Sequence, residues 1–369
     1  MVKMLIMDKK NSLNLNNKLP LLDIFRIFIF AMVFLFHAQG HRFWILEKGT
    51  IFHSNLATGA LYMDAFFILS GFLLFYLYSD KLQNLSISAL KEFYLKRIKR
   101  IYPHYIVSTI VICVLSGFIL SAIPIELLCL QGFFPQIFTK MGNDGSWFIS
   151  CLLFSYLLFP VLNKLVISTK KDYLVLFLLY ISLVYFVIMG IELKIKWVAI
   201  YIHPLYRMLE ILVGMYVSKI FLNKQLNTNI ASVVSIFSIC LLFILVPILF
   251  KNNFINHVKF AQNYLDYVVI TVPLFSVIIY SLSCIKNKFI DIFCNLKFIK
   301  MLTVLTFPFF IWQPVGQKIT KDLIKAFSLN DYSFLLLFII TLALSVFAYI
   351  IIDIIPKCIK NVLRGEKND

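Results

Sequence analysis

Residues 232–250 read SVVSIFSICLLFILVPILF, a run that is apolar on every face and contains no charged side chain. An α-helix rises about 1.5 Å per residue, so a run of this length crosses a hydrocarbon core of about 30 Å. Lipid offers no partners to backbone N–H and C=O groups, which favours a helix. A membrane β-barrel would instead show strict alternation of apolar and polar residues. The run therefore predicts a membrane-spanning helix.

The composition extends this prediction to the whole chain. Of 369 residues, 61% are hydrophobic and 14% are charged, whereas soluble domains are about 45–50% apolar and about 25% charged. We therefore predict an all-α, polytopic membrane protein with about ten transmembrane helices, nine or eleven being the alternatives. The ten apolar segments are 20–39, 56–78, 102–122, 146–164, 172–191, 199–221, 230–250, 264–284, 301–317 and 332–355.

The net charge of +17 is explained by membrane topology. The basic residues lie in short segments between apolar runs and not in the aromatic-interleaved patch typical of nucleic-acid binding. Counted from a cytoplasmic N-terminus, 23 of them face inward and 10 face outward, which predicts that both termini are cytoplasmic. We expect a cytoplasmic tail at 1–19 that is not a cleaved signal peptide, one transmembrane domain at 20–355 and a basic cytoplasmic tail at 356–369. The seven cysteines are scattered without metal-ligand spacing, so no metal site is expected.

Ionisable residues inside apolar segments are costly and normally face a protein interior or a cavity. Arg26 and His37 are eleven residues apart in the first segment, which places them within about 20° of one helix face and about 16 Å apart along it. Asp64, in LYMDAFFILSGFLLF, is a carboxylate that could orient His37. The alternatives are that Arg26 extends to the headgroups and that His37 and Asp64 lie at the outer interface.

Two further pairs repeat at i and i+3, so each pair shares a helix face. Arg97 and Arg100, in KEFYLKRIKRIYPHY, either anchor the chain to anionic lipids or present two guanidinium forks to a diphosphate. Arg207 and Glu210 predict an internal ion pair. Gly71 and Gly214 favour close helix contacts in their segments.

Six blocks, taken together and in order, resemble the acyltransferase-3 family from residue 20 to about 316. They are the Arg26/His37 spacing, MDAFFILSGFLL, KRIKRIYP, GSWFISCLLFSYLLFP, PLYRMLEILVGM and TFPFFIWQPV. The resemblance implies a ten-helix inner-membrane enzyme. Such an enzyme passes an acyl group, usually acetyl from cytoplasmic acetyl-CoA, to a hydroxyl of an envelope polysaccharide or lipid-linked saccharide.

The resemblance also implies roles for individual residues. His37 is the expected catalytic histidine with Arg26 as its companion, and Asp64 matches the family's acidic position. Arg97, Arg100 and the adjacent Tyr102 match the region that holds the coenzyme. Further matches are Trp147, Arg207 and Glu210. The chain departs from the family at Gln313, where relatives commonly carry a histidine, and glutamine cannot shuttle a proton.

Acyl transfer from a thioester to an alcohol needs a base near pH 7. Imidazole, with an ordinary pKa of about 6.5, meets this need. Both a covalent acyl-imidazole and direct transfer between bound partners fit the sequence. The alternative function is a transporter or flippase of lipid-linked glycans, in which the intramembrane charges would bind headgroups without chemistry. The coupling of Arg97 and Arg100 with a histidine of the catalytic type favours the enzyme.

Overall fold

The computed structural model describes residues 19–44, 50–116, 123–140, 143–195, 197–252, 261–356 and 358. Within these residues the chain is helical and contains no strand, so the predicted all-α class is confirmed. Almost all of the two predicted tails lies outside the described residues.

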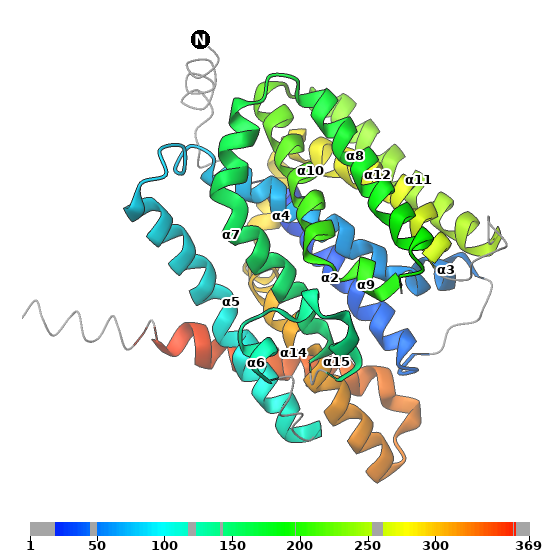
Figure 1. Cartoon of the computed structure of the whole chain (residues 1–369). Helices are drawn as coiled ribbons and strands as arrows, with labels where there is room; N and C mark the ends of the chain where they lie inside the picture. Colours follow the sequence, from blue (N-terminus) through cyan, green and yellow to red (C-terminus); the bar gives the residue numbers. More distant parts are fainter. Residues whose placement is uncertain are drawn as a thin grey trace, which may run out of the picture.

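A long helix forms at each of the ten predicted apolar segments (Figure 1). The long helices are α2 (Pro20–Gly40), α4 (Tyr62–Tyr78), α5 (Ile87–Ser116), α7 (Trp147–Ser168), α8 (Asp172–Glu192), α10 (Pro204–Asn223), α11 (Thr228–Asn252), α12 (Ala261–Cys284), α14 (Lys297–Phe327) and α15 (Ser333–Tyr349), which continues as a π-helix at Ile350–Ile354. The short helices are α3 (Ile51–Ala57), α6 (Ile123–Leu127), α9 (Trp197–Tyr201) and α13 (Lys288–Asn295), with 3-10 turns η1 (Gly59–Leu61), η2 (Gln131–Phe133), η3 (Pro135–Lys140), η4 (Asp144–Ser146) and η5 (Asn330–Tyr332).

Among the described residues, eight helical segments are long and apolar enough to cross a bilayer. A ninth candidate is a pair of helices, Val268–Cys284 and Lys288–Asn295, which meet at a bend of 100°. The pair counts as a ninth spanning segment if both helices belong to one crossing of the bilayer. α10 is not among them because it carries three charged side chains, Arg207, Glu210 and Lys219. The chain is therefore a multi-pass helical protein, and the number ten and the placement of the termini stay predictions.

α4 and α10 cross in the middle of the molecule, with α8, α11 and α12 on one side and α5, α14 and α15 on the other (Figure 1). Gly71 lies directly against the backbone of Ile211, and Gly214 lies against the backbone of Ile68. A methyl group at either glycine would overlap a carbonyl of the other helix. Both predicted close contacts are thus confirmed, and they are one and the same crossing.

Prolines lie in several of the predicted segments. In 199–221 the helix is broken just before Pro204, since α9 ends at Tyr201 and α10 begins at Pro204. Pro204 occupies the first turn of α10, where it needs no hydrogen-bond partner, and His203 caps this turn by accepting from the Leu205 N–H at 3.3 Å. Pro308 and Pro314 lie inside α14, which continues to Phe327. Packing against neighbouring helices makes such prolines tolerable in a membrane protein.

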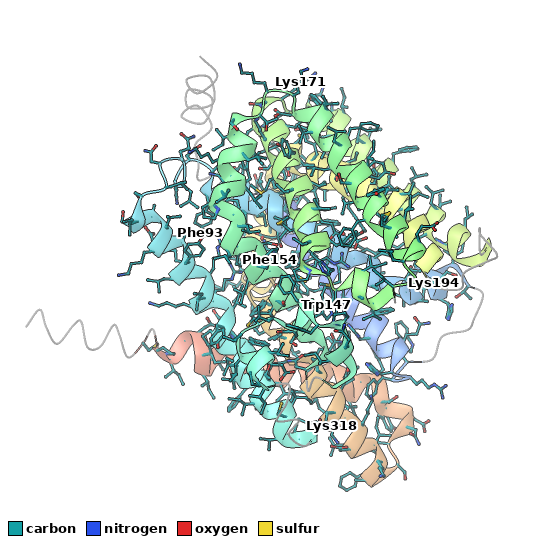
Figure 2. The ribbon with its side chains drawn as sticks, in the orientation of Figure 1. Phe93, Trp147, Phe154, Lys171, Lys194 and Lys318 are labelled. Carbon is teal, nitrogen blue, oxygen red and sulfur yellow. The ribbon has the colours of Figure 1, made fainter. Side chains whose placement is uncertain are left out.

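Aromatic side chains fill much of the interior, and most of the described lysines lie at the periphery. Figure 2 shows Phe93 and Trp147 within the bundle and Lys171, Lys194 and Lys318 at its edges. Trp147 is 6% exposed and Phe93 is 1% exposed. This distribution positions the few buried charges of the chain among aromatic rings.

Candidate active site

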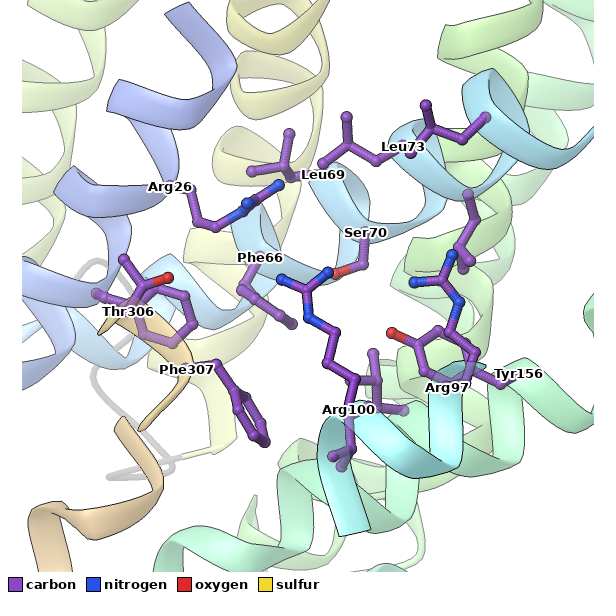
Figure 3. A pocket seen from close by; sticks show the side chains of 15 residues that line it. Arg26, Phe66, Leu69, Ser70, Leu73, Arg97, Arg100, Tyr156, Thr306 and Phe307 are labelled. Carbon is purple, nitrogen blue, oxygen red and sulfur yellow. The ribbon is translucent and has the colours of Figure 1, made fainter. Parts of the chain in front are cut away.

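Three arginines surround one cavity towards the end of the bundle where α2 begins and α4 ends. Figure 3 shows Arg26 of α2 and Arg97 and Arg100 of α5 projecting towards the same space. The cavity has a volume of about 120 Å³, and α4, α7 and α14 complete its wall. We call it the arginine cavity. It joins Arg26, from the first predicted block, to the pair from the third.

The arginine cavity has an excess of positive charge. Arg26 has a carboxylate partner in Asp23, at 3.4 Å. The Arg97 guanidinium lies over the rings of Tyr78 and Tyr156, 4.5 and 5.4 Å from their centroids, and its Nε has no hydrogen-bond partner among the described residues. Within the same residues neither Arg97 nor Arg100 forms an ion pair. Guanidinium groups held in this way suit an anionic ligand, above all a phosphate, which they bind through two parallel hydrogen bonds.

His37 lies on α2 but towards its other end. Its ring is 6.2 Å from the ring of His41 and nearly parallel to it, with an interplanar angle of 12°. His41 in turn lies 3.3 Å from the Lys321 ammonium of α14. The eleven residues between Arg26 and His37 correspond to about 16 Å along the helix. Arg26 thus lies at the arginine cavity, and His37 lies about three helical turns further along the same helix.

Four phenylalanines pack in a ring beside the arginine cavity. Phe30, Phe66, Phe148 and Phe310 come from α2, α4, α7 and α14, and each ring contacts the next at centroid distances of 5.3, 4.8, 5.1 and 5.4 Å around a closed cycle. Phe30 and Phe66 also line the cavity. We call this set the phenylalanine ring. Its α2 member, Phe30, lies between Arg26 and His37 along that helix.

Arg207, Asp64 and Glu210 form a fully buried ionic cluster. Arg207 Nη1 donates to Asp64 at 2.6 Å and to Glu210 at 2.8 Å, and all three side chains are 0% exposed. Arg207 Nε donates to the Tyr201 carbonyl at 2.7 Å. The guanidinium is also flanked by the ring of Trp147 at 5.5 Å. The predicted internal pair of Arg207 and Glu210 is present, with Asp64 as a third member.

The structure corrects the surroundings expected for two residues. Asp64 is not at an outer interface: its Oδ1 accepts from Arg207 and its Oδ2 accepts from the Thr271 hydroxyl at 3.3 Å. Asp64 is thus joined to Arg207 of α10 and Thr271 of α12, and its orientation of His37 stays a prediction. Tyr102 donates its hydroxyl to the Leu127 carbonyl at 2.9 Å, so it ties α5 to α6 and does not line the arginine cavity.

The phenylalanine ring was not predicted from the sequence, since 38 phenylalanines give no reason to select four. A signal was nonetheless present. Phe66, Phe148 and Phe310 each fall in a different one of the six blocks, and Phe30 lies between Arg26 and His37. If the blocks are expected to pack against one another, contact between these rings is expected as well.

The fold and the arginine cavity define a class, a multi-pass helical membrane protein with a cationic cavity and a histidine near the end of its first long helix. A family model described as an acyltransferase domain, acyltransferase-3, matches residues 19–354. The chain belongs to this family of acyltransferase domains.

Two curated proteins are similar over part of their length. An acyltransferase named MdmB from Streptomyces mycarofaciens is 28% identical over 161 residues, 40% of this chain and 40% of that protein. An uncharacterized protein from Haemophilus influenzae is 33% identical over 148 residues, 34% of this chain and 58% of its own length. The chain thus matches less than two thirds of either relative. No solved structure matches the chain significantly.

Gln313 of α14 is 3% exposed, and its amide nitrogen has no partner among the described residues. An amide does not shuttle protons, so the chain must work without a proton shuttle at this position. We therefore expect Gln313→His to change acyl transfer by less than about tenfold, equivalent to ~1.4 kcal/mol of barrier. Gln313→Leu should cost more, since it removes hydrogen-bonding capacity from a buried site. Both variants are to be compared with wild type in one acyl-CoA-dependent assay. A large gain with histidine would mean that a proton shuttle had been lost, and full activity with leucine would reduce Gln313 to a packing residue.

Proposed function

We propose that this acyltransferase moves an acyl group, in the first instance acetyl, from acyl-coenzyme A to a hydroxyl of a cell-surface or lipid-linked polysaccharide. The observation that carries the proposal is the arginine cavity. Arg26, Arg97 and Arg100 converge there from two helices, with one carboxylate beside them at Asp23. Coenzyme A carries a diphosphate and a third phosphate, which match this excess of positive charge.

The arrangement of the site supports a cytoplasmic donor. In the proposed topology both termini are cytoplasmic in the inner membrane, so the arginine cavity opens towards the cytoplasmic acyl-CoA pool. The pantetheine arm of the donor would then extend past the phenylalanine ring towards His37. An acceptor would approach His37 from the opposite end of the bundle.

His37 acts as the general base in this proposal. The acceptor O–H loses its proton to the imidazole as its oxygen bonds to the thioester carbonyl carbon. The C–S bond then breaks, the coenzyme leaves as a thiolate that takes up a proton, and the ester product remains. Arg26 helps to hold the donor so that the thioester is presented to the imidazole.

The test is release of free thiol from acetyl-CoA by the purified protein in the presence of a polysaccharide acceptor, followed by mass spectrometry of surface polysaccharide from cells with and without the gene. We expect thiol release, together with an alkali-labile mass increase of one acetyl group in cells that carry the gene. A transporter of lipid-linked glycans would release no thiol. The absence of thiol release by folded protein would therefore favour that alternative.

We expect Arg97→Ala combined with Arg100→Ala to raise the KM for acyl-CoA by more than about tenfold with a smaller effect on acceptor use. Charge-assisted bonds to phosphates supply affinity for the bound donor, and about 1.4 kcal/mol corresponds to each factor of ten. The measurement is steady-state kinetics with each substrate varied in turn.

The matched control is Lys96→Ala combined with Lys99→Ala, which removes the same charge from the same helix. Both lysines are exposed, and Lys96 pairs with Glu92 outside the arginine cavity. An equal rise in donor KM for the two double variants would mean that α5 contributes only general positive charge, as a membrane anchor does.

A further inference from the structure

A histidine and an aspartate join α5 to the end of the last long helix. His104 Nε2 lies 2.7 Å from Asp353 Oδ2, although the two residues are 249 positions apart. Because an ionised carboxylate only accepts, the His104 N–H donates this hydrogen bond. The His104 side chain is 2% exposed and the Asp353 side chain is 25% exposed. Figure 1 shows this C-terminal end of the described chain, coloured red, beside α5. We call the two residues the His104/Asp353 pair.

Asp353 reaches α5 from an unusual stretch of backbone. α15 ends at Tyr349, and the π-helix Ile350–Ile354 contains Asp353. Turns of π-helix are rare and frequently lie at functional sites. Asp353 is also within the candidate span Asn330–Ile354, where a carboxylate is costly and is normally paired with another polar group. Both observations indicate that the contact with His104, and not packing against lipid, explains a carboxylate at this position.

The His104/Asp353 pair adjoins the arginine cavity without lining it. The rings of His104 and Phe307 meet edge to face, with centroids 6.0 Å apart and an interplanar angle of 87°. Phe307 of α14 lines the cavity, and so does Arg100 (Figure 3). Arg100 is four residues before His104 on α5, so the two side chains share one helix face. The pair is therefore one side chain away from the cavity on two helices.

The three arginines of the cavity differ in what holds them. Arg26 has a carboxylate partner in Asp23. The Arg97 guanidinium lies over aromatic rings. The Arg100 guanidinium has neither an ion pair nor a cation–π contact with any residue that the structure describes. The direction of Arg100 therefore depends on the backbone of α5.

Pro103 makes the backbone of α5 sensitive to contacts near this point. It lies inside α5, between Arg100 and His104. Proline has no N–H, so the hydrogen bond to the carbonyl of Lys99 is missing, and helices bend at such positions. The direction of the turn that carries Arg100 then depends on contacts on both sides of the proline. His104, the next residue, supplies such a contact through Asp353.

We propose that His104 and Asp353 are positioning residues of the donor site. The hydrogen bond between them fixes α5 beyond Pro103 and so directs Arg100 into the arginine cavity. This bond sets the orientation of the His104 ring, because the other ring nitrogen, Nδ1, has no partner among the described residues. Neither residue touches the donor. The proposal rests on the proposed function in one respect, which is the identity of the anion that Arg100 binds.

The first test is equilibrium binding without turnover. The full-length protein in detergent is titrated with acetyl-CoA in a calorimeter. We expect Asp353→Ala to weaken binding about 3- to 10-fold, because Arg100 no longer meets the phosphates in a fixed direction. Asp353→Asn keeps an oxygen that accepts from His104, so it should bind within about twofold of wild type. Unchanged affinity in Asp353→Ala, or an equal loss in both variants, overturns the proposal.

A double-mutant cycle separates positioning from general support of the fold. If the pair acts through Arg100, Asp353→Ala should change acetyl-CoA affinity by less than about twofold in protein that already carries Arg100→Ala. If the pair supports only the fold, the two losses multiply, and that result overturns the proposal. His104→Phe keeps a ring against Phe307 and removes the hydrogen bond. It carries both tests, with the same expected losses, if Asp353→Ala gives no monodisperse protein.

The matched control is Tyr94→Phe, which removes another hydrogen bond between α5 and a neighbouring helix. The Tyr94 hydroxyl donates to the Leu157 carbonyl of α7 at 2.9 Å. Tyr94 does not line the arginine cavity. We expect Tyr94→Phe to bind acetyl-CoA as wild type does. A loss equal to that of Asp353→Ala would mean that any contact of α5 affects binding, which overturns the specific role of the pair.

Inorganic pyrophosphate, titrated in the same way, separates this proposal from the proposed function. Pyrophosphate binding that weakens about 3- to 10-fold in Asp353→Ala, in a protein that neither binds acetyl-CoA nor releases thiol from it, would uphold the positioning role and refute the acyl donor. Acetyl-CoA binding that Asp353→Ala leaves unchanged would refute the positioning role and leave the donor in place. Binding of neither probe by folded wild-type protein overturns both.

Discussion

Replacement of His37 by alanine is expected to lower acyl transfer by about 10²- to 10⁴-fold while leaving the protein inserted and folded. The loss removes a proton acceptor that acts in the transition state, and packing does not replace it. The side chain is only partly buried, so truncation leaves no large cavity. The measurement is transfer of labelled acetyl from acetyl-CoA, normalised to protein that elutes as a single peak in size-exclusion chromatography.

His37→Gln is the matched variant, since it keeps hydrogen-bonding capacity and removes basicity. It should be as inactive as His37→Ala. Activity near the wild-type level in either variant would refute His37 as the base. If glutamine alone restored activity, His37 would act by hydrogen bonding and the base would lie elsewhere.

Arg207→Ala is expected to prevent the accumulation of folded protein. It leaves the carboxylates of Asp64 and Glu210 in a site with 0% exposure and without the guanidinium that both contact. Removal of one member of a buried ion pair costs about 3–5 kcal/mol, which is comparable with the whole stability of many domains. The measurement is the yield of monodisperse protein and its thermal midpoint in detergent.

A combined variant separates folding from chemistry at this cluster. Arg207→Met with Asp64→Asn and Glu210→Gln removes all three charges at similar volume, and neutral replacement of a whole buried cluster is often tolerated. We expect it to recover folded protein that Arg207→Ala lacks. Normal folding of Arg207→Ala with a loss of activity alone would instead assign the cluster to catalysis.

Asp64 and His37 illustrate where prediction from the sequence ended. Both residues lie in the blocks that resemble the family, and a carboxylate beside a histidine is a sound expectation. Helical periodicity, however, describes only one helix at a time, whereas a contact depends on how two helices are rotated against each other. The crossing at Gly71 and Gly214 turns the first turn of α4 towards Arg207 of α10 and so gives Asp64 another partner.

The amino-acid sequence alone was enough to predict the helical class, the positions of the long helices, the close contacts at Gly71 and Gly214 and the family. These properties depend on residues close together in the sequence. In lipid, the backbone N–H and C=O groups of an apolar run must form hydrogen bonds with one another, and a motif consists of neighbouring residues. Which distant side chains share a site became visible only in the three-dimensional packing of the helices. In the structure, Arg26 of α2 lines the same cavity as Arg97 and Arg100 of α5. Four phenylalanines from four helices contact one another beside this cavity. The physical reason is that these contacts depend on helix rotation and crossing, which the packing of the whole bundle sets.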